Sequence, residues 1–176
     1  MRIRDSLHHQ TYIEHSKSIL YAADENLELL KSFMDSRDQD SRVKTLGLYR
    51  STMILYAVSL ELILKARALY EERDWLLSQK KPTFKEFLAR WNGNKTGHDF
   101  FRIVDHYKID ISKEDRELLE NFKEFTGWAG RYPYPKDDLA VQKMEKEGRN
   151  LGSAGLRFKN RAHEFIKREV EIMDKN

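Results

Sequence analysis

The sequence contains no cysteine among its 176 residues. This absence excludes a disulfide framework, a thiol nucleophile and a metal site built from thiolates. Long hydrophobic runs are also missing, because the longest apolar segment, residues 53–64, is interrupted by Ser59 and Glu61 and falls short of the roughly 20 residues that cross a bilayer. The first residues carry no apolar core of a signal peptide. We therefore expect a soluble protein of the cytoplasm.

A large excess of one charge is likewise absent. The 32 basic and 29 acidic residues leave a formal net charge of +3, which is small for a protein that binds nucleic acid regardless of its sequence. The net charge does not exclude a local patch of basic residues. The length and the hydrophobic share of 40% are typical of a globular protein and exclude a disordered one. We expect residues 1–176 to form a single domain.

Helical periodicity is present along nearly the whole chain. In residues 5–34 apolar side chains recur at seven-residue steps, with further small or apolar residues between them: Ile13, Leu20, Leu27 and Met34, with Ser16, Ala23 and Leu30. This apolar stripe predicts a long amphipathic helix and is long enough to pair with a second copy of the chain. A second helix is expected over residues 42–75, with Ser41 as its N-cap. Because that helix is apolar on several faces, we place it in the middle of a bundle.

Shorter helices are expected in the remainder of the chain. Pro82 suits the first turn of a helix that reaches Trp91, and another helix begins near His98. Ser112 and Asp115 have the spacing of a capping box that opens a further helix. The last two expected helices cover residues 138–147 and 153–173. The predicted fold is an all-α, antiparallel helical bundle with two long N-terminal helices plus shorter ones.

Two polar features lie within these predicted helices. Glu61 and Lys65 stand four residues apart, which suits an ion pair on a helix surface, although a charged pair among so many apolar residues could also line a pocket between helices. Residues 96–99, Thr-Gly-His-Asp, lie at a helix start and could serve as its scaffold, as an anion or nucleotide contact, or as metal ligands. The metal interpretation is the weakest, because the adjacent His98 and Asp99 point about 100° apart on a helix.

Two further features could carry chemistry on RNA. The segment around Arg131 and Tyr132 is stiffened by prolines, so it could stack on a base and contact a phosphate, or equally plug the end of the bundle. Arg157 and His163 are the side-chain types of a metal-free ribonuclease, in which Arg stabilises phosphate charge and His moves a proton. They stand six positions apart, which places them about 120° apart around a helix, so they converge only partly, and His163 could instead pack within the bundle.

These features occur in a familiar order. A glutamate and a lysine in a long helix (Glu61, Lys65), then Thr-Gly-His-Asp, then Arg-Tyr-Pro beginning at Arg131, resemble the HEPN family, the nucleotide-binding domain of higher eukaryotes and prokaryotes, over about residues 45–173. The resemblance implies an antiparallel helical bundle that is usually dimeric. It also implies a role beside a nucleotidyltransferase, or in a toxin–antitoxin or antiphage system. Active ribonucleases of the family use Arg-x(4–6)-His, completed across the dimer without metal.

Arg157 and His163 match that motif here, and Phe158 follows the arginine where the family often has a polar residue. The resemblance leaves three functions open. The first is a nucleotide- or RNA-binding module, with or without a partner protein such as a nucleotidyltransferase or an antitoxin. The second is a metal-independent endoribonuclease that uses Arg157 and His163. The third is a non-catalytic helical protein-interaction module. The contacts expected for the first are Lys65, His98, Asp99, Arg131 and Tyr132. We expect no cofactor, no metal and no membrane contact, and a homodimer.

Overall fold

The computed structural model describes residues 5–34, 39–93, 97–127, 138–147 and 158–175. In that part of the chain every regular element is a helix and no strand occurs, which confirms the all-α prediction. The elements are a 3-10 turn, η1 (Asp5–Leu7), and the helices α1 (His9–Met34), α2 (Gln39–Glu71), α3 (Arg73–Ser78), α4 (Phe84–Asn92), α5 (Phe100–His106), α6 (Lys113–Gly127), α7 (Asp138–Glu147) and α8 (Phe158–Asp174). None of the described helices is long and apolar enough to cross a membrane.

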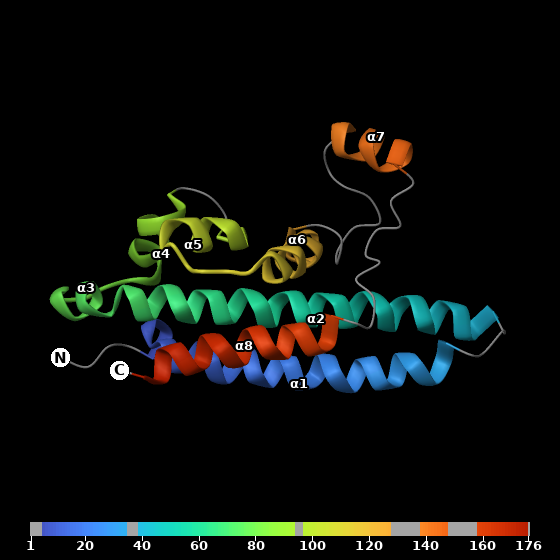
Figure 1. The fold of residues 1–176 in the computed structure, drawn as a ribbon, viewed down its shortest axis with the longest axis horizontal. Helices are drawn as coiled ribbons and strands as arrows, with labels where there is room; N and C mark the ends of the chain where they lie inside the picture. The colour runs from blue at the N-terminus through green and yellow to red at the C-terminus, as the bar shows by residue number, and fades with distance from the viewer. Residues whose placement is uncertain (1–4, 35–38, 94–96, 128–137, 148–157, 176) are drawn as a thin grey trace.

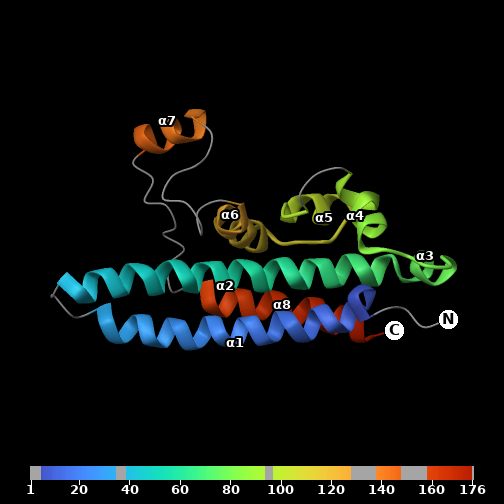
Figure 2. The same ribbon diagram turned by 180° about the vertical axis from the view of Figure 1, so that it is seen from behind.

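The long helix α2 lies at the centre of the bundle, as its apolar faces predict. It packs against α1 and α8 on one side and against α5 and α6 on the other (Figure 1). The reverse view in Figure 2 shows the same arrangement, with α7 standing apart from the other helices. At the end where α1 finishes and α2 begins, this pair of helices extends beyond α8 in both views.

The apolar stripe of α1 lies within the bundle, where α1 packs mainly against α2. Its members are buried, except Met34 at the end of the helix, which is exposed. In the middle of the interface two serines exchange hydrogen bonds: the Ser16 hydroxyl donates to the Ser59 carbonyl at 2.8 Å, and the Ser59 hydroxyl donates to the Ser16 carbonyl at 2.9 Å. Small hydroxyl residues therefore let the two backbones approach closely. The stripe is not free to pair with a second copy of the chain, so that interpretation was wrong.

Several predicted helix ends differ from the structure. The second helix ends at Glu71 rather than continuing to residue 75, because the buried Glu72 leaves helical geometry and accepts hydrogen bonds from Arg90 at 2.6 Å and Tyr107 at 3.1 Å. At its other end α2 begins at Gln39, so Ser41 lies inside the helix and is not its N-cap. The fourth helix begins after Thr83, which forms a capping box with Glu86, so Pro82 precedes the helix instead of occupying its first turn.

Other helix signals were interpreted correctly. The backbone N–H of Asp115 donates to the Ser112 hydroxyl at 3.0 Å, and the backbone N–H of Ser112 donates to the Asp115 carboxylate at 2.9 Å. This reciprocal pair is the predicted capping box, and α6 follows it. The residues of the last helix that were expected to face inward are buried where the structure describes them: Ala162, Ile166, Val170 and Met173.

One ion-pair network crosses the centre of the bundle. Glu169 of α8 is fully buried, and its carboxylate accepts a hydrogen bond from Arg67 of α2 at 3.1 Å. Arg168 lies 3.6 Å from the same carboxylate and 3.0 Å from that of Asp115 in α6. Burial raises the pKa of Glu169 and outweighs the opposite effect of the two guanidinium groups. This network joins three helices through groups that are costly to bury, so it requires them to meet in one register.

Candidate functional site

The imidazole of His163 and the carboxylate of Asp24 meet at the edge between α8 and α1. The distance from His163 Nε2 to Asp24 Oδ2 is 2.7 Å, although 139 residues separate the two positions. The His163 side chain is 44% exposed, whereas that of Asp24 is 18% exposed. An accessible imidazole is thus held by a largely shielded carboxylate. His163 is not packed within the bundle, which was the alternative interpretation.

Two further side chains converge on the Asp24 carboxylate. The Tyr56 hydroxyl of α2 donates to Asp24 Oδ1 at 2.6 Å. Burial, together with this hydrogen bond, raises the pKa of Tyr56 far above its usual value, so the phenol remains a proton donor to the carboxylate. The Lys159 ammonium lies 3.6 Å from the same oxygen and 3.5 Å from Glu28. We refer to Asp24, Tyr56, Lys159 and His163 as the Asp24 cluster.

The packing of α8 explains why its polar residues reach this edge. Phe158, Ala162 and Phe165 are buried against the bundle, and they fix the rotation of the helix. Lys159 and His163, which are four residues apart, then share the flank that faces α1. Arg161 lies on another side, where its guanidinium pairs with Glu117 of α6 at 3.2 Å. Only part of the basic segment at the start of α8 therefore belongs to the Asp24 cluster.

A second polar cluster joins α2 to the segment before α5. Glu61 accepts from Lys65 at 2.5 Å, and its two carboxylate oxygens lie 3.0 and 3.2 Å from His98 Nδ1. The side chains of Glu61 and Lys65 are only 10% and 12% exposed. The pair is therefore not a solvated helix-surface pair. We refer to Glu61, Lys65 and His98 as the Glu61 cluster.

Local backbone geometry places His98 on Glu61. Gly97 has a φ of +77°, a conformation that side-chain-bearing residues rarely adopt, and a Cβ there would lie 3.4 Å from Leu88 of α4. Asp99 then caps α5, because its carboxylate accepts from the backbone N–H of Phe101 at 3.2 Å. The scaffold interpretation of the Thr-Gly-His-Asp segment therefore holds for Asp99, whose carboxylate serves the helix start.

The structure brings some sequence-predicted residues together and separates others. Lys65 and His98 both contact the Glu61 carboxylate, and Asp99 is the residue that follows His98. His163 lies in the other cluster. Arg131, Tyr132 and Arg157 lie outside the described residues.

Sequence analysis missed Asp24, Tyr56 and Lys159. Asp24 immediately follows Ala23, a member of the apolar stripe, and such a position lies at the edge of a helix interface. This position was the only sequence feature that could have indicated Asp24.

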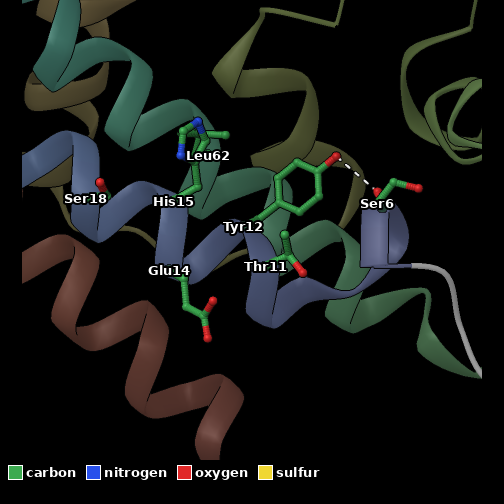
Figure 3. A pocket seen from close by; sticks show the side chains of 7 residues that line it. All are labelled: Ser6, Thr11, Tyr12, Glu14, His15, Ser18 and Leu62. Carbon is green, nitrogen blue, oxygen red and sulfur yellow. Dashed lines mark hydrogen bonds between the residues drawn. The ribbon is translucent and has the colours of Figure 1, made fainter.

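A shallow hollow of about 540 Å³ lies beside the first turns of α1 (Figure 3). The Tyr12 hydroxyl, which donates to the Ser6 carbonyl at 3.2 Å, lies along it, and Leu62 of α2 lies behind it. His15 and Glu14 point to opposite sides of α1 in Figure 3, with Glu14 directed toward the side on which α8 lies. The polar groups around the hollow do not converge, so we do not treat it as a reaction centre.

Neither cluster has the composition of a metal centre. Among the described residues, no three His, Asp or Glu side chains come together as metal ligands. In comparisons with known proteins, no protein-family model matched the chain, and searches of curated proteins and of solved structures found no match. The likeness to the HEPN family therefore depends on the sequence motifs alone.

Proposed function

We propose that this chain is a HEPN-like RNA-binding protein that cleaves RNA without a metal ion at the Asp24 cluster. The observation that carries the proposal is the half-exposed His163 held at 2.7 Å by the Asp24 carboxylate. A histidine oriented by a carboxylate is the usual arrangement of a general acid or base, because the partner fixes the ring and its tautomer. The proposal favours the second of the three functions that the sequence leaves open.

The hydrogen-bonding pattern defines the proton-transfer atom. Because a carboxylate accepts hydrogen bonds and does not donate them, we assign the proton of this contact to Nε2 of His163, which leaves Nδ1 to exchange a proton with a substrate. Asp24 is itself fixed by the Tyr56 hydroxyl, which does not lose its proton near neutral pH. An imidazole both takes up and releases protons in that range. His163 can therefore act as a base or as an acid, while Asp24 positions it.

RNA supplies its own nucleophile in a metal-free cleavage. A base removes the proton of a ribose 2′-hydroxyl, the oxygen attacks the adjacent phosphorus, and the bond from phosphorus to the 5′-oxygen breaks as that oxygen gains a proton. Lys159, beside His163, supplies a positive charge for the phosphate. The family resemblance assigns the same task to Arg157. It also implies a homodimer, in which one His163 can serve as base and the other as acid.

Binding without cleavage is the second candidate function, and the Glu61 cluster favours it. The His98 side chain is 43% exposed, and its Nδ1 lies within hydrogen-bond distance of Glu61. Its other ring nitrogen, Nε2, is therefore directed away from the carboxylate. A nucleotide or RNA contact by His98, with Lys65, Asp99, Arg131 and Tyr132, is the form that the resemblance implies. The Lys65 side chain is only 12% exposed and Asp99 caps α5, so these two side chains are less available to a ligand than His163, which is 44% exposed.

Cleavage of a mixed-sequence RNA in EDTA by the wild type and by His163→Ala tests the first proposal. We expect the wild type to cut and the variant to bind the same RNA but cut it roughly a hundredfold more slowly, the usual effect of losing a general acid or base. Binding of RNA without cleavage by the wild type would support the second candidate instead. If the wild type neither binds nor cleaves the RNA, both proposed functions are wrong, and the protein-interaction module is the function that remains.

A further inference from the structure

Tyr21 is an exposed aromatic residue close to the Asp24 cluster. Its side chain is 68% exposed on α1, three residues before Asp24. Residues three apart on a helix lie about 4.5 Å apart along the axis and on the same side. Within the described part of the chain, no ring contact or hydrogen bond accounts for this tyrosine. Exposure of a large aromatic ring beside a polar cluster is a common property of binding surfaces.

The pairing of α1 with α8 shows what lies opposite Tyr21. Glu28 meets Lys159 and Asp24 meets His163, so the two helices run antiparallel along this flank. One more step of four residues in the same direction brings α1 to the buried Leu20, beside Tyr21 in the chain, and α8 to residue 167. Lys167 stands four residues after His163, and its side chain is mostly exposed, with its ammonium 3.9 Å from Glu171.

The flank of α1 that faces α8 is therefore continuous on both sides of Tyr21. Asp24 lies on one side of it in a described contact with α8. Glu14 lies two turns earlier and points toward the same side in Figure 3. An aromatic ring, a histidine and two lysines, Lys159 and Lys167, thus occur along one edge, together with the carboxylates that pair with them. Along a nucleic acid strand, bases that can stack alternate with negatively charged phosphates.

We propose that Tyr21 stacks on a base next to the scissile phosphate and restricts the site to single-stranded RNA. This inference rests on the proposed function, because it uses the same edge of the molecule. A base can stack on a side chain only when it is not paired and stacked inside a duplex. Lys167 supplies a phosphate contact one turn beyond His163. The alternation of charge and aromatic ring favours a single strand over a double helix, whose recognition depends on backbone and groove shape.

Fluorescence anisotropy with a labelled, mixed-sequence single-stranded RNA tests the inference, and the same RNA annealed to its complement serves as the duplex probe. We expect Tyr21→Ala to bind the single strand about 5- to 150-fold more weakly, the range for removing one stacking aromatic. Tyr21→Phe keeps the ring and should bind as the wild type does. Leu77→Ala is the control, because Leu77 is 51% exposed and lies in α3, away from the Asp24 cluster. Thermal melts of all variants check folding.

The outcomes separate this inference from the proposed function. If Tyr21→Ala binds single-stranded RNA as tightly as the wild type, stacking is wrong, whether or not the wild type cleaves. If duplex RNA binds as tightly as the single strand, the restriction to single strands is wrong. If Tyr21→Ala loses binding, Tyr21→Phe and Leu77→Ala keep it, and the wild type does not cleave, the stacking inference stands and the ribonuclease proposal is wrong. If the wild type binds neither RNA, both fall.

Discussion

His163 Nε2 lies 2.7 Å from Asp24 Oδ2, and this contact joins the last helix to the first across 139 residues. The histidine is accessible, and the aspartate is shielded by Tyr56 and Lys159. In the proposed function this contact positions His163 for proton transfer, and the first predictions concern what holds the ring in place.

Asp24→Asn should slow RNA cleavage without weakening RNA binding. An amide N–H in place of the carboxylate oxygen would face His163 Nε2 and favour the wrong tautomer of the ring. The equivalent change in a Ser-His-Asp triad lowers the rate by roughly 10⁴, so we expect a loss between about tenfold and that limit. Single-turnover cleavage rates measure it. Glu25→Gln, an exposed carboxylate on the same helix, is the control and should cut normally. Normal cleavage by Asp24→Asn would remove Asp24 as a positioning residue.

Tyr56→Phe should destabilise the protein and slow cleavage less than Asp24→Asn does. The change removes the hydroxyl that donates to Asp24 at 2.6 Å, and a hydrogen bond of this kind contributes about 0.5–1.5 kcal/mol to the free energy of unfolding. The contact between Asp24 and His163 stays. Urea denaturation gives the stability change. Tyr12→Phe loses an exposed hydroxyl bond to Ser6 and should leave stability nearly unchanged. Equal effects of the two variants would contradict the structural role of Tyr56.

Glu169→Gln should change how stability depends on pH. Burial raises the pKa of Glu169 in the folded protein above its ordinary value of 4.5, so the folded state holds this proton more tightly than the unfolded chain. That contribution to stability is complete below the ordinary pKa and is lost as the pH rises through the raised one. Melting temperatures of both proteins from about pH 4 to pH 7 should therefore shift in favour of the glutamine variant as the pH increases. If the melting temperature of the wild type instead rose relative to that of Glu169→Gln as the pH increases, the pKa of Glu169 would be lowered rather than raised.

The protein should be a homodimer in solution. The family resemblance is the first reason. The second is that α1 and α2 extend beyond α8 at an end where Met34, Val43 and Leu46 are exposed. Sedimentation equilibrium at micromolar concentration should show twice the mass of one chain. Val43→Asp combined with Leu46→Asp should shift the equilibrium toward single chains if this end forms the contact. A wild type that sediments only as single chains at tens of micromolar would contradict the dimer.

The sequence predicted the fold well where one helix carries a complete pattern. The stripe from Ile13 to Leu30 identified α1 and its buried face, and Ser112 with Asp115 identified the start of α6. Prediction from the sequence failed where contacts between distant residues determine the end of a helix. Glu72 ends α2 by accepting from Arg90 and Tyr107, neither of which local sequence can reveal.

The candidate site divides in the same way. An arginine followed by a histidine pointed to His163 as a candidate proton carrier, but the sequence could not show that Asp24 of another helix faces it. Glu61 and Lys65 were recognised as a pair by their spacing. Their burial and the approach of His98 depend on how α5 packs.

The most direct measurement of the central claim is RNA cleavage in EDTA by three proteins: the wild type, His163→Ala, and His15→Ala as a matched histidine control on α1. We predict cleavage by the wild type and by His15→Ala, and a rate roughly a hundredfold or more lower for His163→Ala. The melting temperature and RNA affinity of His163→Ala should stay close to those of the wild type, because an accessible side chain contributes little to the core. Cleavage at the wild-type rate by His163→Ala, or no cleavage by the wild type, would contradict the claim.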